Sequence, residues 1–262
     1  MFEAIRSFRD KLEAGRTCVG VGITLADPQV SEALAESVDF FWIDTEHTLI
    51  NPETLAGHLR MARYKKVPGL VRVAGCATHL IKPVLDSGAH GIIVPQIRSA
   101  EEARQAVTDC IYPPAGKRGF GPRIPSDYGR DMSGACVGLA NENLFIAVQI
   151  ETVEALAEVD EIVSIPRLDS IVVGPYDLSH DMGKAGKVED PEVVAALEQV
   201  IARARARGLF VGTGMEANPD YARRMAARGV QWIQVGCDFE YLIQRADSLR
   251  AAVLGSGDRP SA

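Results

Sequence analysis

Three titratable side chains follow directly on an apolar stretch near residue 40. Residues 40–43 have the character of a buried strand, and Asp44, Glu46 and His47 come immediately after them. A buried strand that delivers acids and an imidazole at its end is a common way for α/β enzymes to build an active site. A solvated loop after a strand would contain similar residues, because charged loops are common. This stretch alone leaves both interpretations open.

An arginine lies between two valines in a second apolar stretch, residues 69–73. Arg72 would be costly to bury without a partner, so we expect it to face an anion. That anion is either a bound ligand or a carboxylate of the chain in a structural ion pair.

Two carboxylates follow two later apolar stretches. Glu151 ends the stretch 143–151, and Asp177 comes shortly after Gly174. Two acids at the ends of adjacent strands would repel each other. A hard divalent cation would relieve the repulsion, and oxygen ligands suit Mg²⁺ or Mn²⁺. A pair that shares one proton, or two acids that point apart, would fit the same pattern.

The elements that must position these residues alternate along the chain. Apolar runs predict eight strands, and most are followed by residues of helical periodicity. The strands are expected at 18–25, 39–46, 69–73, 91–95, 143–151, 168–174, 209–212 and 231–236. Such alternation indicates parallel strands with right-handed crossovers, and eight units favour a closed (β/α)₈ TIM barrel. An open doubly wound sheet is the alternative, although no G-x-G-x-x-G motif follows the first strand.

No linker divides the chain, so we expect a single barrel domain over residues 1–262. A helix at 2–14 would pack on one end of it, and the last helix is expected at 239–253. Residues 111–141 break the rhythm with many Gly and Pro, and a connection of this length is usually functional. In a barrel the C-terminal ends of the strands carry the active site.

The lysines restrict the chemistry. Schiff-base formation needs a lysine inside the barrel, and every lysine is expected on a helix or a loop. A ketone substrate would therefore be activated by a metal and not by an imine. The lysines are Lys11, Lys65, Lys66, Lys82, Lys117, Lys184 and Lys187.

Composition excludes several classes of protein. The formal net charge is −7 and no basic block occurs, which argues against nucleic-acid binding. The five cysteines show no C-x-x-C spacing and indicate free thiols in a reducing, cytoplasmic setting. No apolar run approaches the length of about 18 residues that a membrane span needs.

Six motifs carry a resemblance to a known family. The chain resembles the HpcH/HpaI family of metal-dependent (class II) pyruvate aldolases, such as those for 4-hydroxy-2-oxoheptanedioate and 2-keto-3-deoxy sugar acids. The motifs occur in order over nearly the whole chain: I-D-T-E-H (43–47), V-R-V (71–73), L-I-K-P-V-L-D-S-G-A (80–89), Y-P-P-A-G-K-R-G (112–119), V-Q-I-E-T (148–152) and G-P-Y-D-L-S (174–179).

The resemblance implies a barrel in which Glu151 and Asp177 hold a divalent metal, Mg²⁺ or Mn²⁺ with Co²⁺ as a substitute, and no organic cofactor. Pyruvate would chelate the metal through its carboxylate and ketone oxygens. Arg72 would stabilise the enolate oxygen, and His47 would serve as acid/base for the aldol hydroxyl through a water. Asp86, in the L-D-S-G match, would raise the basicity of His47.

Further expectations concern the rest of the site and the assembly. The resemblance implies that pyruvate is contacted by Gln149, Gly174, Pro175 and Tyr176. Members of the family assemble as hexamers, trimers of dimers that swap terminal helices, so a homo-oligomer is expected. We also expect Glu46 to orient metal-bound waters or its loop, and Asp44 to support His47.

The expected reaction is reversible retro-aldol cleavage of a 4-hydroxy-2-oxo acid to pyruvate, or a close analogue, and an aldehyde. Decarboxylation of oxaloacetate through the same enolate is one alternative. A barrel that binds a keto acid without turnover is another, but such a sensor would need no base. Thr48 and residues 210–215 depart from the family pattern on the aldehyde side, so the sequence leaves the acceptor open.

Overall fold

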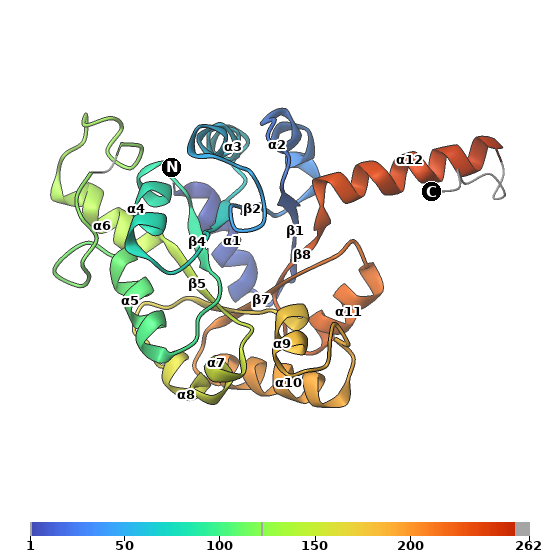
Figure 1. Ribbon diagram of the computed structural model, residues 1–262. Coiled ribbons are helices and arrows are strands. Elements are labelled where there is room, and N and C mark those ends of the chain that lie inside the picture. The colour runs from blue at the N-terminus through green and yellow to red at the C-terminus, as the bar shows by residue number, and fades with distance from the viewer. Residues whose placement is uncertain (1, 122, 255–262) are drawn as a thin grey trace.

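Eight parallel strands form a closed barrel in the order β1 to β8, surrounded by helices (Figure 1). The computed structural model describes residues 2–121 and 123–254. The predicted (β/α)₈ barrel is confirmed. Its strands are β1 (Cys18–Ile23), β2 (Phe40–Asp44), β3 (Gly69–Arg72), β4 (Gly91–Val94), β5 (Phe145–Ile150), β6 (Ser170–Val173), β7 (Phe210–Met215) and β8 (Trp232–Cys237).

Helices connect the strands and cover the outside of the barrel (Figure 1). Several begin at caps that the sequence supplies: Asn51 accepts a hydrogen bond from the Thr54 amide at 2.9 Å, and Ser99 accepts one from Glu102 at 3.2 Å. The helices are α1 (Glu3–Glu13), α2 (Gln29–Leu34), the 3₁₀ turn η1 (Ala35–Ser37), α3 (Pro52–Lys65), α4 (Thr78–Asp86), α5 (Ala100–Cys110), α6 (Gly134–Asn143), α7 (Val153–Ala157), α8 (Val159–Ile162), α9 (Pro175–Asp181), α10 (Pro191–Ala206), α11 (Pro219–Ala227) and α12 (Asp238–Leu254).

An aromatic cluster closes the N-terminal end of the barrel. Phe8 of α1 packs edge-on against Phe40 and Phe145, with ring centroids 5.5 Å apart in both pairs. Trp232, the first residue of β8, contacts the same cluster. A Cβ at Gly20 would lie 2.5 Å from the Phe40 ring, so only glycine leaves room for that ring. The predicted N-terminal helix therefore plugs one end, and the C-terminal ends of the strands form the other.

Two helices were not predicted. Helix α6 begins within the stretch 111–141 and ends at Asn143. We expected irregular structure there, because Gly134 and Gly138 weaken the helical signal. Helix α9 begins at Pro175, directly after β6, where the sequence suggested a loop. Its first turn carries Asp177, so this acid is presented by a helix.

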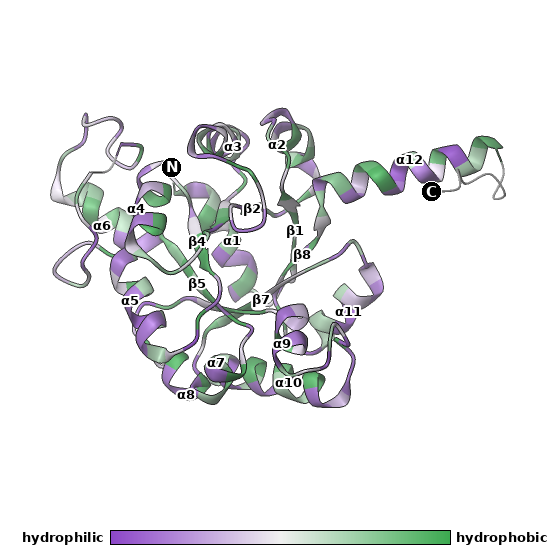
Figure 2. Ribbon diagram, viewed as in Figure 1, coloured by the Kyte–Doolittle hydropathy of each residue, from purple (hydrophilic) through white to green (hydrophobic). Residues whose placement is uncertain are grey.

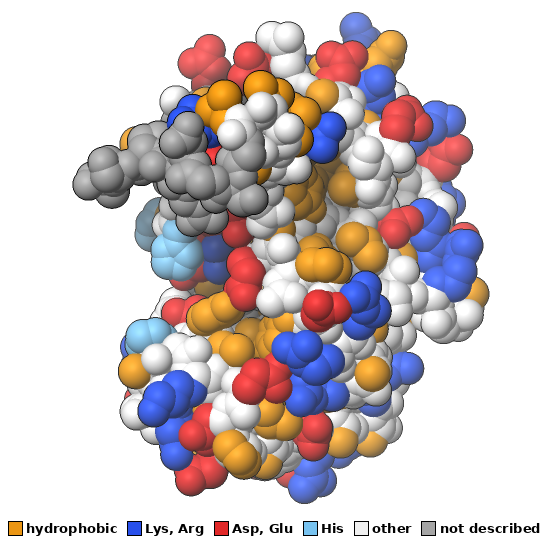
Figure 3. Space-filling view, turned by 90° about the vertical axis from the view of Figure 1, so that its right-hand side faces the viewer, with side chains coloured by type: hydrophobic (Ala, Val, Ile, Leu, Met, Phe, Trp, Pro, Cys, Tyr) orange, Lys and Arg blue, Asp and Glu red, His pale blue; other side chains and the backbone are white. Residues whose placement is uncertain are grey.

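The last helix, α12, extends away from the barrel (Figure 1). Apolar and polar residues alternate along it (Figure 2), and Asp238 is its buried residue. Apolar side chains are visible on this helix from the side to which it projects (Figure 3). Within the described ranges, no helix is both long enough and apolar enough to cross a membrane.

Candidate active site

A cavity of about 360 Å³ lies at the C-terminal ends of the strands, at the end opposite the α1 plug. Strands β2, β3, β5, β6, β7 and β8 contribute to its wall, together with the first residues of α9 and α12. Six residues expected from the sequence line it, namely Arg72, Gln149, Gly174, Pro175, Tyr176 and Asp177. The barrel therefore brings most of the expected site together.

Arg72 is held by two carboxylates of its own chain. The register of β2 and β3 sets Asp44 beside Arg72. Arg72 Nε and Nη2 donate to the two oxygens of Asp44 at 2.9 and 2.7 Å, and Nη1 lies 3.1 Å from Glu46 Oε2. Burial opposes the charged form, but the hydrogen bond and charge of Asp44 outweigh it and raise the pKa of Arg72. The anionic partner expected for Arg72 thus includes Asp44, whose oxygens are not directed to His47 as we had expected.

Glu46 is placed by the turn that follows β2. Its amide donates to Asp44 Oδ1 at 3.0 Å, and the neighbouring Thr45 hydroxyl donates to the carbonyl of Arg72 at 2.7 Å. Burial is the main cause that raises the pKa of Glu46; the Arg72 charge opposes this shift, while those of Asp44 and Asp177 add to it. The carboxylate of Glu46 therefore lies close enough to Arg72, Asp44 and Asp177 to feel their charges.

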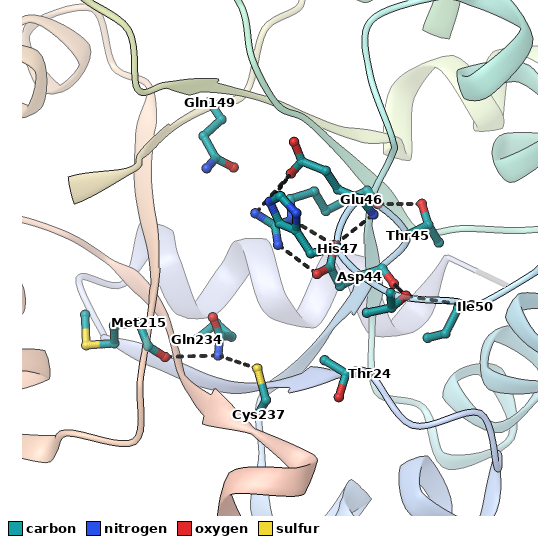
Figure 4. A network of polar contacts seen from close by, with 12 residues as sticks. Thr24, Asp44, Thr45, Glu46, His47, Ile50, Gln149, Met215, Gln234 and Cys237 are labelled. Carbon is teal, nitrogen blue, oxygen red and sulfur yellow. Dashed lines mark hydrogen bonds and ion pairs between the residues drawn. The ribbon is translucent and has the colours of Figure 1, made fainter. Parts of the chain in front are cut away.

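His47 lies at the rim beside Glu46. Its Nε2 is 3.5 Å from Glu46 Oε2, and 64% of the side chain is exposed. Figure 4 shows Glu46 and His47 on one side of the barrel opening and Gln149 on the other. An imidazole in this position is open to water and can exchange protons with solvent.

Glu151 is a buried carboxylate directly after β5. Its Oε1 accepts a hydrogen bond from the Gln96 amide at 2.7 Å, and its Oε2 accepts one from Gln149 Nε2. Burial raises the pKa of Glu151 to about 7; the Gln96 hydrogen bond opposes the shift, and the charges of Asp177 and Glu46 add to it. This acid lies where its negative charge is poorly tolerated unless a cation compensates it.

Two further features surround Glu151. The Oε1 atom of Gln149 is buried and has no hydrogen-bond partner. A Cβ at Gly174 would lie 2.7 Å from Glu151 Oε2, so glycine allows the backbone after β6 to approach this carboxylate closely. The site therefore has an unsatisfied acceptor next to a crowded carboxylate.

These residues fit a divalent cation. Glu151 and Asp177 are near enough for their charges to raise the pKa of Glu151, and a cation would relieve this repulsion. In the described part of the chain no three His, Cys, Asp or Glu side chains form a metal-binding group. A cation held by two carboxylates would take its other ligands from water and substrate. Mg²⁺ is commonly bound in this way, whereas a structural zinc site is closed by four protein ligands.

The lysines lie where the sequence indicated. Lys11, Lys65 and Lys82 are on helices, and the other four are in connections or at a helix end. All seven lysines are among the described residues, and none of them lies on a barrel strand.

Asp86 does not meet His47 within one chain. It ends α4, where its Oδ1 lies 2.7 Å from Nη2 of the buried Arg118. Asp86 lines a different cavity of about 1090 Å³, together with Arg60, Arg123 and Tyr128. The acid that the resemblance assigned to His47 is thus on another part of the surface.

Several site residues were missed in the sequence. Glu216 follows β7 and accepts a hydrogen bond from the Tyr176 hydroxyl, and Gln234 and Glu240 line the same cavity. Strand β7 was predicted to end at residue 212 but reaches Met215, so Glu216 was not recognised as a residue at a strand end. Gln96, which donates to Glu151, has a φ of 54°. A polar residue in this left-handed conformation directly after a strand has no distinctive sequence signal.

The fold and the cavity define a barrel enzyme whose acids and arginine converge at the C-terminal ends of the strands. The model of the family described as HpcH/HpaI aldolase/citrate lyase matches residues 23–245. The chain belongs to this family, and the expectation of a class II aldolase of this family is confirmed.

Similar proteins cover nearly the whole chain. The 4-hydroxy-2-oxo-heptane-1,7-dioate aldolase of Salmonella typhimurium is 37% identical over 247 residues, 94% of this chain and 93% of that protein. The crystal structure of an HpcH/HpaI aldolase from Desulfitobacterium hafniense has a TM-score of 0.87 at 30% identity and covers 96% of this chain and 98% of that one. The crystal structure of citrate synthase SbnG has a TM-score of 0.83 at 30% identity, with the same coverage.

Proposed function

We propose that this protein catalyses the reversible retro-aldol cleavage of a 4-hydroxy-2-oxo acid to pyruvate and an aldehyde, with a divalent metal as cofactor. The observation that carries the proposal is that Arg72 and Asp177 line one cavity at the C-terminal end of the barrel, and that Glu151 lies behind its wall, hydrogen-bonded to Gln149 and coupled to the charge of Asp177. The similarity to the Salmonella typhimurium aldolase supports the reaction class.

Glu151 and Asp177 would hold the metal, with Mg²⁺ or Mn²⁺ as the preferred ions. A bound divalent cation polarises a ketone oxygen and makes the adjacent carbon acidic. The partnerless Oε1 of Gln149, a residue of the same cavity wall, would accept a hydrogen bond from a water beside Glu151.

Arg72 supplies a fixed positive charge. Its guanidinium is oriented by Asp44 and Glu46 before any ligand arrives, and 15% of its side chain remains exposed in the cavity wall. A preorganised donor of this kind stabilises the negative charge that develops on the enolate oxygen. The ion pairs of Arg72 with Asp44 and Glu46 are therefore compatible with a catalytic role for Arg72.

His47 would move the proton of the substrate hydroxyl. In the cleavage direction the hydroxyl proton passes to His47 through a water, and the bond between C3 and C4 breaks. The aldehyde departs, and the electron pair remains as the enolate. The enolate then takes up a proton from water at C3 and becomes the methyl group of pyruvate, while His47 releases the hydroxyl proton to solvent. The exposed position of His47 allows it to exchange that proton with solvent.

Asp86 could assist His47 only from a second copy of the chain, because within one chain it lines a different cavity and pairs with Arg118 there. The exposed apolar side chains of α12 support a homo-oligomer, which the resemblance suggests is a helix-swapped hexamer. These side chains are Phe239, Leu242, Ile243, Leu249, Val253 and Leu254. We propose that neighbouring copies complete one another's sites.

Pyruvate release tests the proposed function. A panel of 4-hydroxy-2-oxo acids and oxaloacetate should be assayed with metal and with excess chelator. We expect pyruvate from at least one 4-hydroxy-2-oxo acid and loss of this activity in chelator. Full activity in chelator would refute the metal assignment, and turnover of oxaloacetate alone would favour the decarboxylase.

A further inference from the structure

The wall of the active-site cavity that belongs to β7 and β8 is acidic. Glu216 comes directly after β7 and accepts a hydrogen bond from the Tyr176 hydroxyl. Glu240, in the first turn of α12, accepts a hydrogen bond from the Cys237 amide at 2.6 Å. Both carboxylates line the same cavity as Arg72. This wall is separate from the strands that carry Glu151 and Gln149.

No cation offsets these two acids within the described ranges. Arg72 is the one Lys or Arg among the described residues that line the cavity. Its three nitrogens are directed to Asp44 and Glu46. A metal held by Glu151 and Asp177 would be neutralised by those two carboxylates. The charges of Glu216 and Glu240 therefore face whatever part of the substrate extends from the keto-acid end.

The keto-acid end of the substrate is located by independent features. The buried Oε1 of Gln149 can only accept a hydrogen bond or face a cation, and Gly174 lets the backbone approach Glu151 closely, so these features mark the β5–β6 side as the metal end, where a chelating keto acid would be anchored. A ligand anchored there and beside Arg72 extends within the remaining cavity toward Tyr176 and Glu216. That part of the ligand is the portion released as the aldehyde.

We infer that Glu216, which accepts a hydrogen bond from Tyr176, selects the aldehyde by its charge, favouring a neutral, hydroxylated aldehyde over one that carries a carboxylate. This inference rests on the proposed aldolase function. A carboxylate on the aldehyde would meet like charges, whereas a hydroxyl group can donate a hydrogen bond to Glu216. The acceptor then differs from the one implied by a heptane-1,7-dioate substrate, whose cleavage yields an aldehyde with a terminal carboxylate.

The test compares two aldehydes of similar size as acceptors for pyruvate. The metal-loaded full chain is assayed in the aldol-addition direction with D-glyceraldehyde and with 4-oxobutanoate, and kcat/KM is measured for each. We expect glyceraldehyde to be preferred by about tenfold or more, the effect of like charges a few ångströms apart in a partly solvated site. A preference for 4-oxobutanoate would overturn the inference.

Substitutions identify the residues responsible. Glu216→Gln should reduce the preference for glyceraldehyde by about fivefold, mainly by improving the use of 4-oxobutanoate. Tyr176→Phe removes the hydroxyl but leaves the Glu216 charge, so the anionic aldehyde should remain disfavoured. Glu198→Gln on the outer face of α10 is the matched control, because Glu198 pairs with Arg228 away from the cavity. An unchanged preference in Glu216→Gln would overturn the assignment to Glu216.

Failure of the proposed function gives a different result. If the metal-loaded protein neither adds pyruvate to either aldehyde nor releases it from any 4-hydroxy-2-oxo acid, the aldolase proposal is refuted, and this inference with it. If both aldehydes react and 4-oxobutanoate is used equally well, the aldolase proposal stands and the selectivity is refuted. Glu216 is exposed, so its substitution should leave the fold intact.

Discussion

Asp44 and Arg72 face each other on neighbouring parallel strands and are joined by two hydrogen bonds, of 2.9 and 2.7 Å. The guanidinium also lies over the Trp42 ring, 5.6 Å from its centroid. The arginine is therefore fixed by groups of the chain and does not depend on a ligand for its orientation. A donor held in this way costs little reorganisation when negative charge develops nearby.

Arg72→Ala should lower both activity and stability. We expect a loss of kcat of about a hundredfold, typical of removing a preorganised donor. We also expect the free energy of unfolding to fall by about 3 kcal/mol, because Asp44 would be left buried without its partner. Urea denaturation and pyruvate release measure the two effects.

The double variant Asp44→Asn/Arg72→Ala separates these effects. Replacing the unpaired Asp44 carboxylate with a neutral amide should recover part of the stability but none of the activity. Equal stability of the single and double variants would show that the unpaired Asp44 is not the cause of the destabilisation.

His47→Ala should affect two reactions unequally. Retro-aldol cleavage requires a base for the substrate hydroxyl, and we expect a loss of about a hundredfold or more. Oxaloacetate has no such hydroxyl, so its decarboxylation should change much less. Parallel assays of pyruvate release from both substrates measure the ratio, with His180→Ala on α9 as the control imidazole. Equal losses would contradict the role of His47 as the base.

The affinity for metal should depend on the protonation of Glu151. The pKa of this acid is raised to about 7 without metal, and only the ionised form binds a cation. Affinity for Mn²⁺ should therefore be full well above pH 7 and fall about tenfold per pH unit below it. Titrations followed by electron paramagnetic resonance would measure the profile.

Two variants control for this assignment. Glu151→Gln should bind Mn²⁺ weakly at every pH. Glu154→Gln should retain the profile of the unaltered protein, because Glu154 is paired with Arg98 on the surface. A wild-type affinity that does not change between pH 6 and about 8 would exclude Glu151 as the titrating ligand.

The barrel was predictable because each strand is a short apolar run and most crossovers contain a segment of helical periodicity. That Arg72 needs an anion was equally predictable, since a buried guanidinium cannot remain unpaired. The identity of the anion was not, because it depends on the register that aligns Asp44 with Arg72. We assigned Asp44 to His47 because sequence proximity suggested it.

The missed residues share one physical cause. A polar residue could be assigned to the site only where the end of the preceding strand was predicted correctly. Strand β7 contains two glycines, which weaken the strand signal. Its end was placed three residues early, so Glu216 and its pairing with Tyr176 were overlooked. In the same way, the helix that presents Asp177 is too short to show periodicity.

The proposal that neighbouring copies share sites predicts complementation between variants. Asp86 lies beside Arg118 in its own chain, so if it assists His47 the two residues come from different copies. His47→Ala and Asp86→Ala should each be impaired alone. Co-expressed at equal levels, they should form mixed oligomers in which roughly a quarter of the sites combine an intact His47 with an intact Asp86. Pyruvate release should then exceed that of either variant by a corresponding amount.

The complementation experiment has an internal control. Two variants with defects in the same site of one chain, His47→Ala and Arg72→Ala, should not complement each other, because both side chains lie beside Glu46 of the same chain. Light scattering should show the mixed species to be oligomers. Activity no greater than that of the separate variants, in oligomers shown to contain both chains, would place Asp86 outside the catalytic site and leave its contact with Arg118 as its role.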